Sequence, residues 1–464
     1  MGQNNNPLPD GWVHSTVAEI YDIVGGGTPS TSVPEFWQGT IPWITSADIY
    51  GLKDIRPRKQ VSEEAVRSSA TNVVPKDSLI VVTRVGLGKV GLADTQMCFS
   101  QDSHALVNRG AKPDTLYALY YLSQAVSVFK HENRGTTIAG VTKKQLATLP
   151  FPLPPLAEQH RIVAAIEEHL TRLDAGVAAL KRAQAKLRRY KAAVLKAACE
   201  GRLVPQDPSD EPADVLLGRI LAERRARWEA DELAKLRAKG KEPLGDAWKL
   251  KYEEPRGPDT LALPALPEGW VWTTLPQLGE LARGKSKHRP RDDARLYGGP
   301  YPFVQTGEVK HSNGTISTYT QTYSEFGLAQ SRLWPKGTLC ITIAANIADT
   351  GILNFEACFP DSVVGFIGRE TDSNVRFVEY FLRTAKDNLE RYAPATAQKN
   401  INLETLNALG IPFPPLAEQE RIVAEVDRRL SIVREVEAEI DANLARARAL
   451  RQAVLAKAFA GAAQ

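Results

Sequence analysis

One ten-residue phrase occurs twice in this chain and constrains its architecture more than any other feature. It reads PPLAEQHRIV at residues 154–163 and PPLAEQERIV at residues 414–423, so the copies differ only where His160 becomes Glu420. From Pro154 to Pro414 the offset is 260 residues. An internal repeat at a fixed offset predicts one structural unit written twice.

Further matched segments extend the repeat over most of the chain. At the offset of 260 they are AVLKAACEG and AVLAKAFAG (193–201 and 453–461), and PKDSLIV and PKGTLCI (75–81 and 335–341). Near the front, LPDGW and LPEGW are related by 258 (8–12 and 266–270). The residues between these segments differ widely, which indicates a shared scaffold that presents different surfaces.

Each copy of the phrase opens a stretch with apolar residues at heptad spacing, the pattern of a coiled-coil helix. The first seam consists of Ile166, Leu173, Leu180, Leu187 and Val194, with Val163, Leu170 and Val177 in the alternate row. The second consists of Val426, Val433, Ile440, Ala447 and Val454, with Val423, Leu430 and Leu444. Prolines before each stretch and glycines after it, Gly201 and Gly461, are typical helix boundaries. We expect the helices to pair within the chain, antiparallel if a two-fold axis relates the units; pairing with another copy is the alternative.

The rest of each copy is predicted to be a mixed α and β head. Apolar runs rich in Val, Ile and Thr predict buried strands, and apolar residues at helical spacing predict a helix that packs on each sheet (77–85, 337–346, 114–131 and 375–392). We therefore predict an α+β chain with two pseudo-repeated heads, residues 1–150 and 264–410, separated by two long helices that form an antiparallel intramolecular coiled coil. The central region, 151–263, holds the first long helix at about 155–200, a connector helix at about 212–240 and a linker. The second long helix lies in 411–464.

Composition limits the compartment and the partners. No apolar run approaches the roughly eighteen residues of a membrane-spanning helix, and the start, MGQNNNPLPDGW, lacks the regions of a signal peptide. We expect a soluble cytoplasmic protein with no membrane contact. The four cysteines form no CxxC pair and suit reduced core thiols. A net charge of +4 does not by itself indicate a nucleic-acid partner, although basic runs occur at 181–191 and 283–295.

The usual catalytic motifs are missing from the sequence. GLGKV at 86–90 lacks the first glycine and the final Ser or Thr of a phosphate-binding loop, and GGGT at 25–28 lacks the GxGxxG spacing. There is no HExxH metal helix, no GxSxG nucleophile turn and no Asn/Asp-Pro-Pro-aromatic tetrad. The seven histidines are scattered rather than placed at metal-ligand spacing. We therefore expect no catalytic residues and no metal site in this chain.

These features together resemble the DNA-specificity subunit of type I restriction-modification enzymes. The resemblance rests on two variable heads, each preceded by LPxGW and followed by PPLAEQxRIV and a long helix. The stretch GGGTPSTSVPEFWQGTIPWITSADI (25–49) also resembles the opening of that family's target-recognition domains, whereas the second copy departs there. Such a departure is expected if the two heads read different sequences.

The resemblance implies a non-catalytic subunit. Each head would read one half of a bipartite, asymmetric double-stranded DNA site, and the helical regions would set the gap and bind two modification (adenine methyltransferase) subunits. No cofactor is expected on this chain itself. S-adenosylmethionine would belong to the methyltransferase subunits, and ATP and magnesium to restriction and translocase subunits of a complete system.

Residue type and loop position suggest which side chains contact DNA, because Arg suits guanine, Asn and Gln suit adenine, and Ser, Thr and Lys bind phosphates. In the first head the candidates are Thr28, Ser30, Thr31, Arg84, Lys89, Arg134, Thr136 and Thr137. In the second they are Lys285, Lys287, His288, Arg289, Arg291, Asn346, Gln398, Lys399 and Asn400. For each residue the alternative is an ordinary solvated loop position. Trp37 and Trp43 are interpreted as core residues rather than stacking platforms.

The repeated phrase itself supplies partner-binding candidates. Its polar residues in the first copy are repeated in the second, as Glu158, Gln159 and Arg161 and as Glu418, Gln419 and Arg421. Side chains present in both copies could meet two identical partners. A local explanation is open as well, since Glu near a helix N-terminus suits the helix dipole and can pair with Arg three residues on.

Two other functional classes remain open at this point. A free-standing bivalent DNA-binding protein would bind its site tightly without modification subunits, whereas a specificity subunit should bind well only in complex. A scaffold that bridges proteins would show no steep salt dependence of DNA affinity, which phosphate contacts impose.

Overall fold

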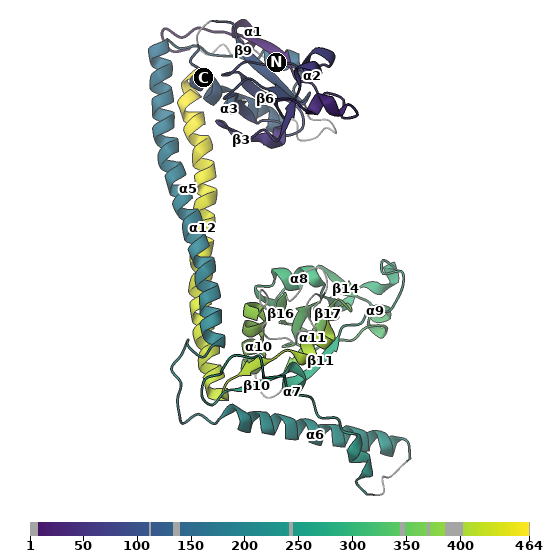
Figure 1. Cartoon of the computed structure of the whole chain (residues 1–464). Coiled ribbons are helices and arrows are strands. Elements are labelled where there is room, and N and C mark those ends of the chain that lie inside the picture. Colours follow the sequence, from purple (N-terminus) through teal and green to yellow (C-terminus); the bar gives the residue numbers. More distant parts are fainter. Residues whose placement is uncertain are drawn as a thin grey trace. The chain divides into compact units, whose positions relative to one another are not determined.

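The computed structural model describes residues 8–110, 113–132, 140–240, 245–343, 349–368, 372–385 and 402–463 (Figure 1). The chain divides into two compact units. The first comprises Met1–Arg182 and Glu439–Gln464, and the second comprises Ala183–Ala438. Each unit therefore contains one head and a part of both long helices.

The first head is built around a four-stranded sheet with the order β1-β9-β6-β7. All its paired neighbours are antiparallel. Its strands are β1 (Tyr21–Gly25), β9 (Ser103–Asn108), β6 (Leu79–Val82) and β7 (Val90–Leu92). A smaller sheet has the order β5-β2-β8, with β5 (Lys59–Val61), β2 (Ile41–Ile44) and β8 (Cys98–Phe99), and β3 (Ile49–Gly51) pairs with β4 (Asp54–Ile55). The helices are α1 (Val17–Ile20), α2 (Glu63–Ser68), α3 (Thr115–Glu132) and α4 (Lys143–Ala147), with short 3-10 turns η1 (Pro34–Trp37) and η2 (Ser46–Asp48).

The second head repeats the main sheet in the order β11-β17-β15-β16 and adds β13 at one edge. These strands are β11 (Gly279–Arg283), β17 (Val363–Gly368), β15 (Leu339–Thr342), β16 (Thr350–Leu353) and β13 (Gly314–Ile316). Two further pairs are β12 (Tyr297–Phe303) with β14 (Gln321–Tyr323), and β10 (Val271–Thr273) with β18 (Ile411–Phe413). The helices are α7 (Leu275–Leu278), α8 (Thr306–His311), α9 (Glu325–Ala329), α10 (Asp372–Ala385) and α11 (Leu403–Ala408), with the 3-10 turn η4 (Ala294–Leu296). The shared strand order confirms the predicted pseudo-repeat.

The predicted strands and helices lie where the apolar patterns placed them. All residues of β6 and β15 are buried, as expected for short apolar runs covered on both faces. The helices expected to pack on these sheets are α3 and α10, and the residues expected to continue α10 beyond Ala385 lie outside the described part of the chain. All four cysteines are buried free thiols.

The two long helices are α5 (Leu156–Cys199) and α12 (Leu416–Ala463). Every apolar seam position predicted in both is buried or half-buried. In the first unit the start of α5 packs with the end of α12, where Asp174 forms an ion pair with Arg451. In the second unit the end of α5 packs with the start of α12, where the Lys191 Nζ lies 3.1 Å from a Glu437 carboxylate oxygen. The helices are therefore antiparallel, as predicted (Figure 1).

Each head core is completed by both long helices. The core of the first head includes Val163, Ile166 and Leu170 from α5, and Leu455 and Phe459 from α12. In the second head the residues at the same repeat positions, shifted by 260, pack in the core, and the two helices exchange roles. These residues are Val423, Val426 and Leu430 from α12, and Leu195 and Cys199 from α5. A head thus folds on the start of its own helix and the end of the other.

A helix from Ala213 to Ala238, α6, occupies the connector between the copies. Its first turns bury Ala213, Leu216 and Ile220 in the core of the second head. Further along, Trp228 stacks on Trp248 of the 3-10 turn η3 (Ala247–Lys251) at a centroid distance of 6.1 Å. None of the helices in the described ranges is both long and apolar enough to cross a membrane.

Candidate nucleic-acid interface

In both heads, the loop after the first strand of the main sheet crosses closely over another backbone segment. A Cβ atom on Gly26 would lie 2.1 Å from the carbonyl oxygen of Ser100. In the second head a Cβ on Gly284 would lie 2.3 Å from the carbonyl oxygen of Phe359. Distances this short exclude any side chain, so glycine is required at the start of each loop.

In the first head this loop carries three of the predicted DNA-binding residues, all exposed: Thr28, Ser30 and Thr31. The indole N–H groups of two tryptophans donate hydrogen bonds to the backbone of this loop. Trp43 Nε1 donates to the carbonyl oxygen of Gly27 across 3.0 Å, and Trp37 Nε1 donates to that of Ser30 across 3.1 Å. The tryptophans therefore fix the backbone and leave the hydroxyls at the surface, with Trp43 itself in the core as predicted.

The next two candidates of the first head differ in what they offer a ligand. The Lys89 ammonium donates to the carbonyl oxygens of Ser46 and Ile49, at 2.7 and 3.1 Å, so it is engaged within the fold. Arg84 is more available, because its exposed guanidinium lies 4.0 Å from Asp102, at the outer limit of an ion pair. The sequence did not distinguish these two residues.

The second head carries its candidates on the corresponding loop. The side chains of Lys285 and Lys287 are exposed and have no partner among the residues that the structure describes. Arg289 donates to the carbonyl oxygens of Ser286 and His288, at 2.7 and 2.8 Å, and Arg291 pairs with Asp361 at 3.0 Å. All of these cations lie at the surface of one loop.

A half-buried acid, Asp293, organises this second loop. Asp293 accepts from Arg295 at 2.7 Å and lies 2.8 Å from the His288 Nε2. The hydrogen bonds from Arg295 hold the pKa of the Asp293 carboxyl well below its usual range. His288 is thereby half-buried, with its ring edge against Phe326 at 5.1 Å, and is less accessible than the lysines beside it.

The remaining predicted DNA-binding residues lie outside the described part of the chain: Arg134, Thr136, Thr137, Asn346, Gln398, Lys399 and Asn400. They stay predictions.

The repeated phrase divides into buried and exposed residues, which sequence alone did not indicate. Gln159 is 2% exposed; its amide accepts from the backbone N–H of Asp114 and donates to the carbonyl oxygen of Pro154. Gln419 is fully buried and donates to the carbonyl oxygen of Pro414 across 2.7 Å. These amides brace the start of each long helix, so their side chains are not available to a partner.

The Glu and Arg of the phrase are not equivalent in the two copies. Within the described residues Glu158 and Arg161 pair only with each other, and the Arg161 side chain is 76% exposed. Glu418 is buried and accepts from Trp270 Nε1 across 2.9 Å, and its burial raises the pKa of its carboxyl. Arg421 forms two hydrogen bonds to Asp210 in the segment before α6. Among these four charged residues, the open pair belongs to the first copy.

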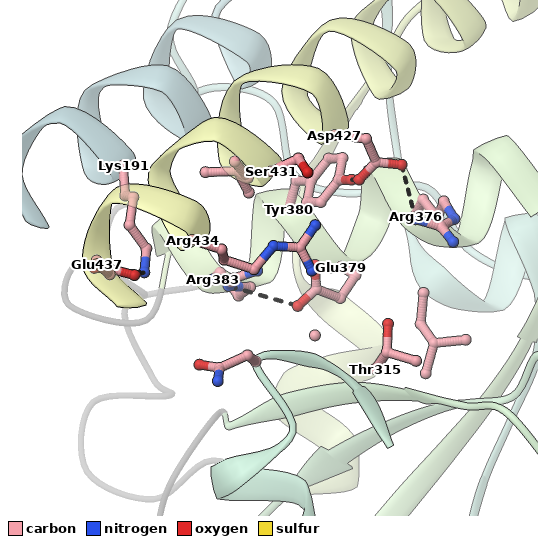
Figure 2. Close-up of a pocket in the computed structure, with 14 residues that line it drawn as sticks. Lys191, Thr315, Arg376, Glu379, Tyr380, Arg383, Asp427, Ser431, Arg434 and Glu437 are labelled. Atoms are coloured by element: carbon pink, nitrogen blue, oxygen red, sulfur yellow. Dashed lines mark hydrogen bonds and ion pairs between the residues drawn. The ribbon is translucent and has the colours of Figure 1, made fainter. Parts of the chain in front are cut away.

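A polar cavity of about 430 Å³ lies in the second unit between α10, the edge of the sheet and the long helices (Figure 2). Figure 2 shows Arg376 beside Asp427 and Arg383 beside Glu379. Glu379 is buried and also accepts from Thr350 at 3.0 Å; burial raises its pKa to about 7. Six of the charged residues that line the cavity thus form three ion pairs: Lys191 with Glu437, Arg376 with Asp427, and Arg383 with Glu379.

The first head is clamped to α5 by residues at the same repeat positions. The Tyr120 hydroxyl donates to Glu167 across 3.3 Å, and the Lys53 ammonium lies 2.5 Å from the same carboxylate. In the second head the shift of 260 turns this pair into Tyr380 and Asp427, which are 2.6 Å apart. Both heads are therefore held on their helices by a tyrosine, an acid and a cation.

Comparison with known proteins decides the family. Residues 9–185 and 267–443 each match the Type I restriction modification DNA specificity domain. The chain belongs to this family. Two copies of one specificity domain, at the positions of the two repeats, are what the internal offset of 260 residues predicts.

Curated relatives within the specificity family carry the same description. The MjaIX specificity subunit of Methanocaldococcus jannaschii is 26% identical over 34% of this chain and 38% of its own length. The EcoR124I/EcoR124II specificity subunit of Escherichia coli is 30% identical over 33% of this chain and 39% of its own length. The EcoDI specificity subunit of Escherichia coli is 24% identical over 74% of this chain and 69% of its own length. The first two alignments thus span well under half of those relatives.

A solved structure supports the fold over the full length. A chain from a study of complex assembly and conformational transition of the type I R-M system aligns with 98% of this chain and 99% of its own residues. The TM-score is 0.62 at 20% sequence identity. At that identity the match shows that the two chains share a fold.

One set of surface residues of the specificity domain was missed by sequence reasoning. Arg56, Arg58, Lys59 and Gln60 form an exposed strip that leads into β5. Arg58 is anchored on Asp48; burial raises the pKa of that carboxyl, but hydrogen bonds from Thr45 and Arg58 outweigh it and the net shift is downward. The available signal was the run RPRKQ at 56–60, which holds three cations among five residues. The small net charge of the whole chain does not reveal such a short basic run.

Proposed function

We propose that the chain is the DNA-specificity subunit of a type I restriction-modification complex. Each head would read one half of a bipartite, asymmetric double-stranded DNA site. The observation that carries this proposal is the pairing of one repeated scaffold with two different surface loops. The main sheets share their strand order, whereas the loop after the first strand reads GGTPSTSV (26–33) in one head and GKSKHRPR (284–291) in the other.

The long helices supply the spacing between the two half-sites. The 44 residues of α5 make a helix on the order of 65 Å long, because each residue adds about 1.5 Å. Two readers joined by one helix pair would engage DNA together, which would multiply their discrimination and set the gap. Unlike heads make the composite site asymmetric.

We infer that the partners are two methyltransferase subunits, and restriction and translocase subunits in a complete system. S-adenosylmethionine, ATP and magnesium would be bound by those partners, and this chain would contribute recognition only. The groove between α5 and α12 in the first unit supports a docking role for the helices. It is lined mainly by apolar or aliphatic side chains, including Ile166, Leu173, Leu450 and Val454, and Leu450 is 54% exposed.

Reconstitution tests the proposal. The chain is combined with a candidate methyltransferase subunit from the same genome, and methylated adenines are mapped on genomic DNA. A bipartite methylation pattern that disappears when this chain is omitted supports the proposal. A pattern that persists without the chain contradicts it. A free-standing bivalent DNA-binding protein would instead bind its site as tightly alone as in the complex.

A further inference from the structure

The two heads carry their cations on the same face but on different segments. The first segment is the loop after the first strand, 27–37 in the first head and 285–295 in the second, at the offset of 258. The second segment leads into the strand that pairs with β2 in the first head, β5, or with β12 in the second head, β14. In the first head this segment is 56–60. Ser62 and Ser324, each the N-cap of the helix that follows, align it with 318–322 in the second head.

The charges of these segments are exchanged between the heads. In the first head the loop GTPSTSVPEFW holds no Lys or Arg, and RPRKQ before α2 holds three. In the second head the loop KSKHRPRDDAR holds five, and TYTQT before α9 holds none. Randomly placed solvated cations would have no reason to alternate in this way.

The two segments are neighbours in the first head. In the first head Thr31 and Trp37 line one hollow together with Arg58, Lys59 and Gln60. The Lys59 ammonium lies 4.9 Å from the centre of the Trp37 ring and 6.0 Å from that of Trp43. The same two indoles hold the loop backbone, so the loop and the cationic strip form one surface.

In the second head the loop contacts the residues that directly follow the second segment, and the hydroxyl oxygens of Ser286 and Tyr323 lie 3.4 Å apart. The Arg295 guanidinium lies over the Phe326 ring of α9 at 4.9 Å, and the backbone N–H of Ser324 donates to the carbonyl oxygen of Leu296. Phe303 pairs with Gln321 in the second head as Trp43 pairs with Lys59 in the first. Lys59 and Gln321 thus occupy the same place in the two folds.

We propose that this face, where the first loop meets the partner strand, is the DNA-contacting surface of both heads, with cations supplied by the strip 56–60 in one and by the loop 285–295 in the other. The inference rests on the proposed function. Lys59 contacts phosphate, because its ammonium has no acidic partner among the described residues and is held in place by Trp37. Gln60, exposed beside it on the same hollow, reads a base edge, since its amide can pair with adenine. Lys285 and Lys287 take the phosphate role in the second head.

The test uses the full chain in complex with its methyltransferase subunit and a duplex that carries the mapped site. Lys59→Gln and Lys287→Gln should each reduce the slope of log affinity against log salt by about 0.9, the value for one phosphate contact. Matched controls are Lys76→Gln and Lys336→Gln, exposed lysines at equivalent positions of the two heads, which should leave the slope unchanged. Gln60→Ala should relax discrimination at one base of one half-site by roughly 5- to 150-fold.

A variant that gains a charge gives a second test, because a folding defect would not increase DNA affinity or its salt dependence. Gln321→Lys adds a cation to the second head at the place of Lys59 and should steepen the salt slope by about the same amount. The inference is overturned if the Lys59 and Lys287 variants keep the wild-type slope, or if the control variants lower it equally. A wild-type complex that reads no bipartite site would overturn the proposed function and this inference together, whereas unchanged slopes on a complex that does read one would overturn only the inference.

Discussion

Tyr380 on α10 donates its hydroxyl to a carboxylate oxygen of Asp427 on α12 across 2.6 Å. Arg376 donates to the other oxygen of the same carboxylate at 2.9 Å. These bonds join the second head to the long helix on which its core is built. In the first head the equivalent bond, from Tyr120 to Glu167, is longer, at 3.3 Å.

Tyr380→Phe should destabilise the second unit by about 1 kcal/mol, because it removes one hydrogen bond while the packing of the ring is kept. Tyr120→Phe should cost less, since its bond is longer. Urea unfolding measures the change in the free energy of unfolding for both variants. Hydrogen exchange shows in which head the change occurs. Tyr319→Phe is the control, as this tyrosine is 46% exposed and lies in the same head as Tyr380. Equal effects of the Tyr380 and Tyr319 substitutions would show that the hydrogen bond from Tyr380 to Asp427 does not stabilise the second unit.

Phe459 lies near the end of α12 yet packs in the core of the first head, with its ring 5.6 Å from that of Tyr117 and 5.4 Å from that of Tyr121. Phe459→Ala should therefore destabilise the first unit by about 3–5 kcal/mol. Hydrogen exchange should accelerate in the first head and stay unchanged in the second. The control on the same helix is Leu450→Ala, whose side chain is 54% exposed and should cost much less. Exchange that accelerates equally in both heads would contradict the division into two units.

The seam pattern was sufficient to predict both long helices, whereas their antiparallel direction was predicted from the repeat on the assumption of a two-fold axis between the units. Leu180, Leu187, Ile440 and Leu444 recur at heptad spacing and are buried or half-buried, as expected for helix pairing. The same pattern could not show that Val163 and Val423, at the ends of the seams, leave the helix pair and complete the head cores. Both environments are apolar, so hydrophobic spacing does not distinguish them.

The DNA-binding residues were harder to predict from the sequence than the long helices. The loop residues Thr28, Ser30 and Thr31 are exposed as expected, because glycines and turn-forming residues mark that loop. The sequence predicts Lys89 as one of these DNA-binding residues, although its ammonium binds two backbone carbonyls that are 43 and 40 residues away in sequence. Partners so distant along the chain leave no local signal. The burial of Gln159 and Gln419 was not predicted either, because glutamine near a helix start is usually exposed.

Glu379 gives the second unit a specific pH dependence. Burial raises its pKa from the ordinary value to about 7, so the folded state holds this proton more tightly than the unfolded state. The stabilisation is complete below the unfolded pKa of about 4.5 and is lost as pH rises through about 7. Glu379→Gln removes this loss. The difference in melting temperature, variant minus wild type, should therefore increase from pH 5 to pH 8. A difference that is constant over this range would show that Glu379 does not titrate there.

The two copies of the repeated phrase should respond differently to the same substitution. Arg421→Gln leaves Asp210, whose side chain is 9% exposed, without its cation and should cost about 1–3 kcal/mol of stability. Arg161→Gln breaks only an exposed pair and should change stability by well under 1 kcal/mol. If the open pair docks a methyltransferase subunit, Arg161→Gln should weaken that association in a pull-down titration. Unchanged association would leave Glu158 and Arg161 as a local helix-start pair.

Exchange of one head tests the central claim most directly. Residues 8–150 are replaced by the first head of another specificity subunit, α5 and α12 are kept, and methylated adenines are mapped on genomic DNA. One half of the bipartite pattern should change, while the other half and the gap should be retained. A pattern in which both halves change, or neither does, would contradict the assignment of one reader to each half-site.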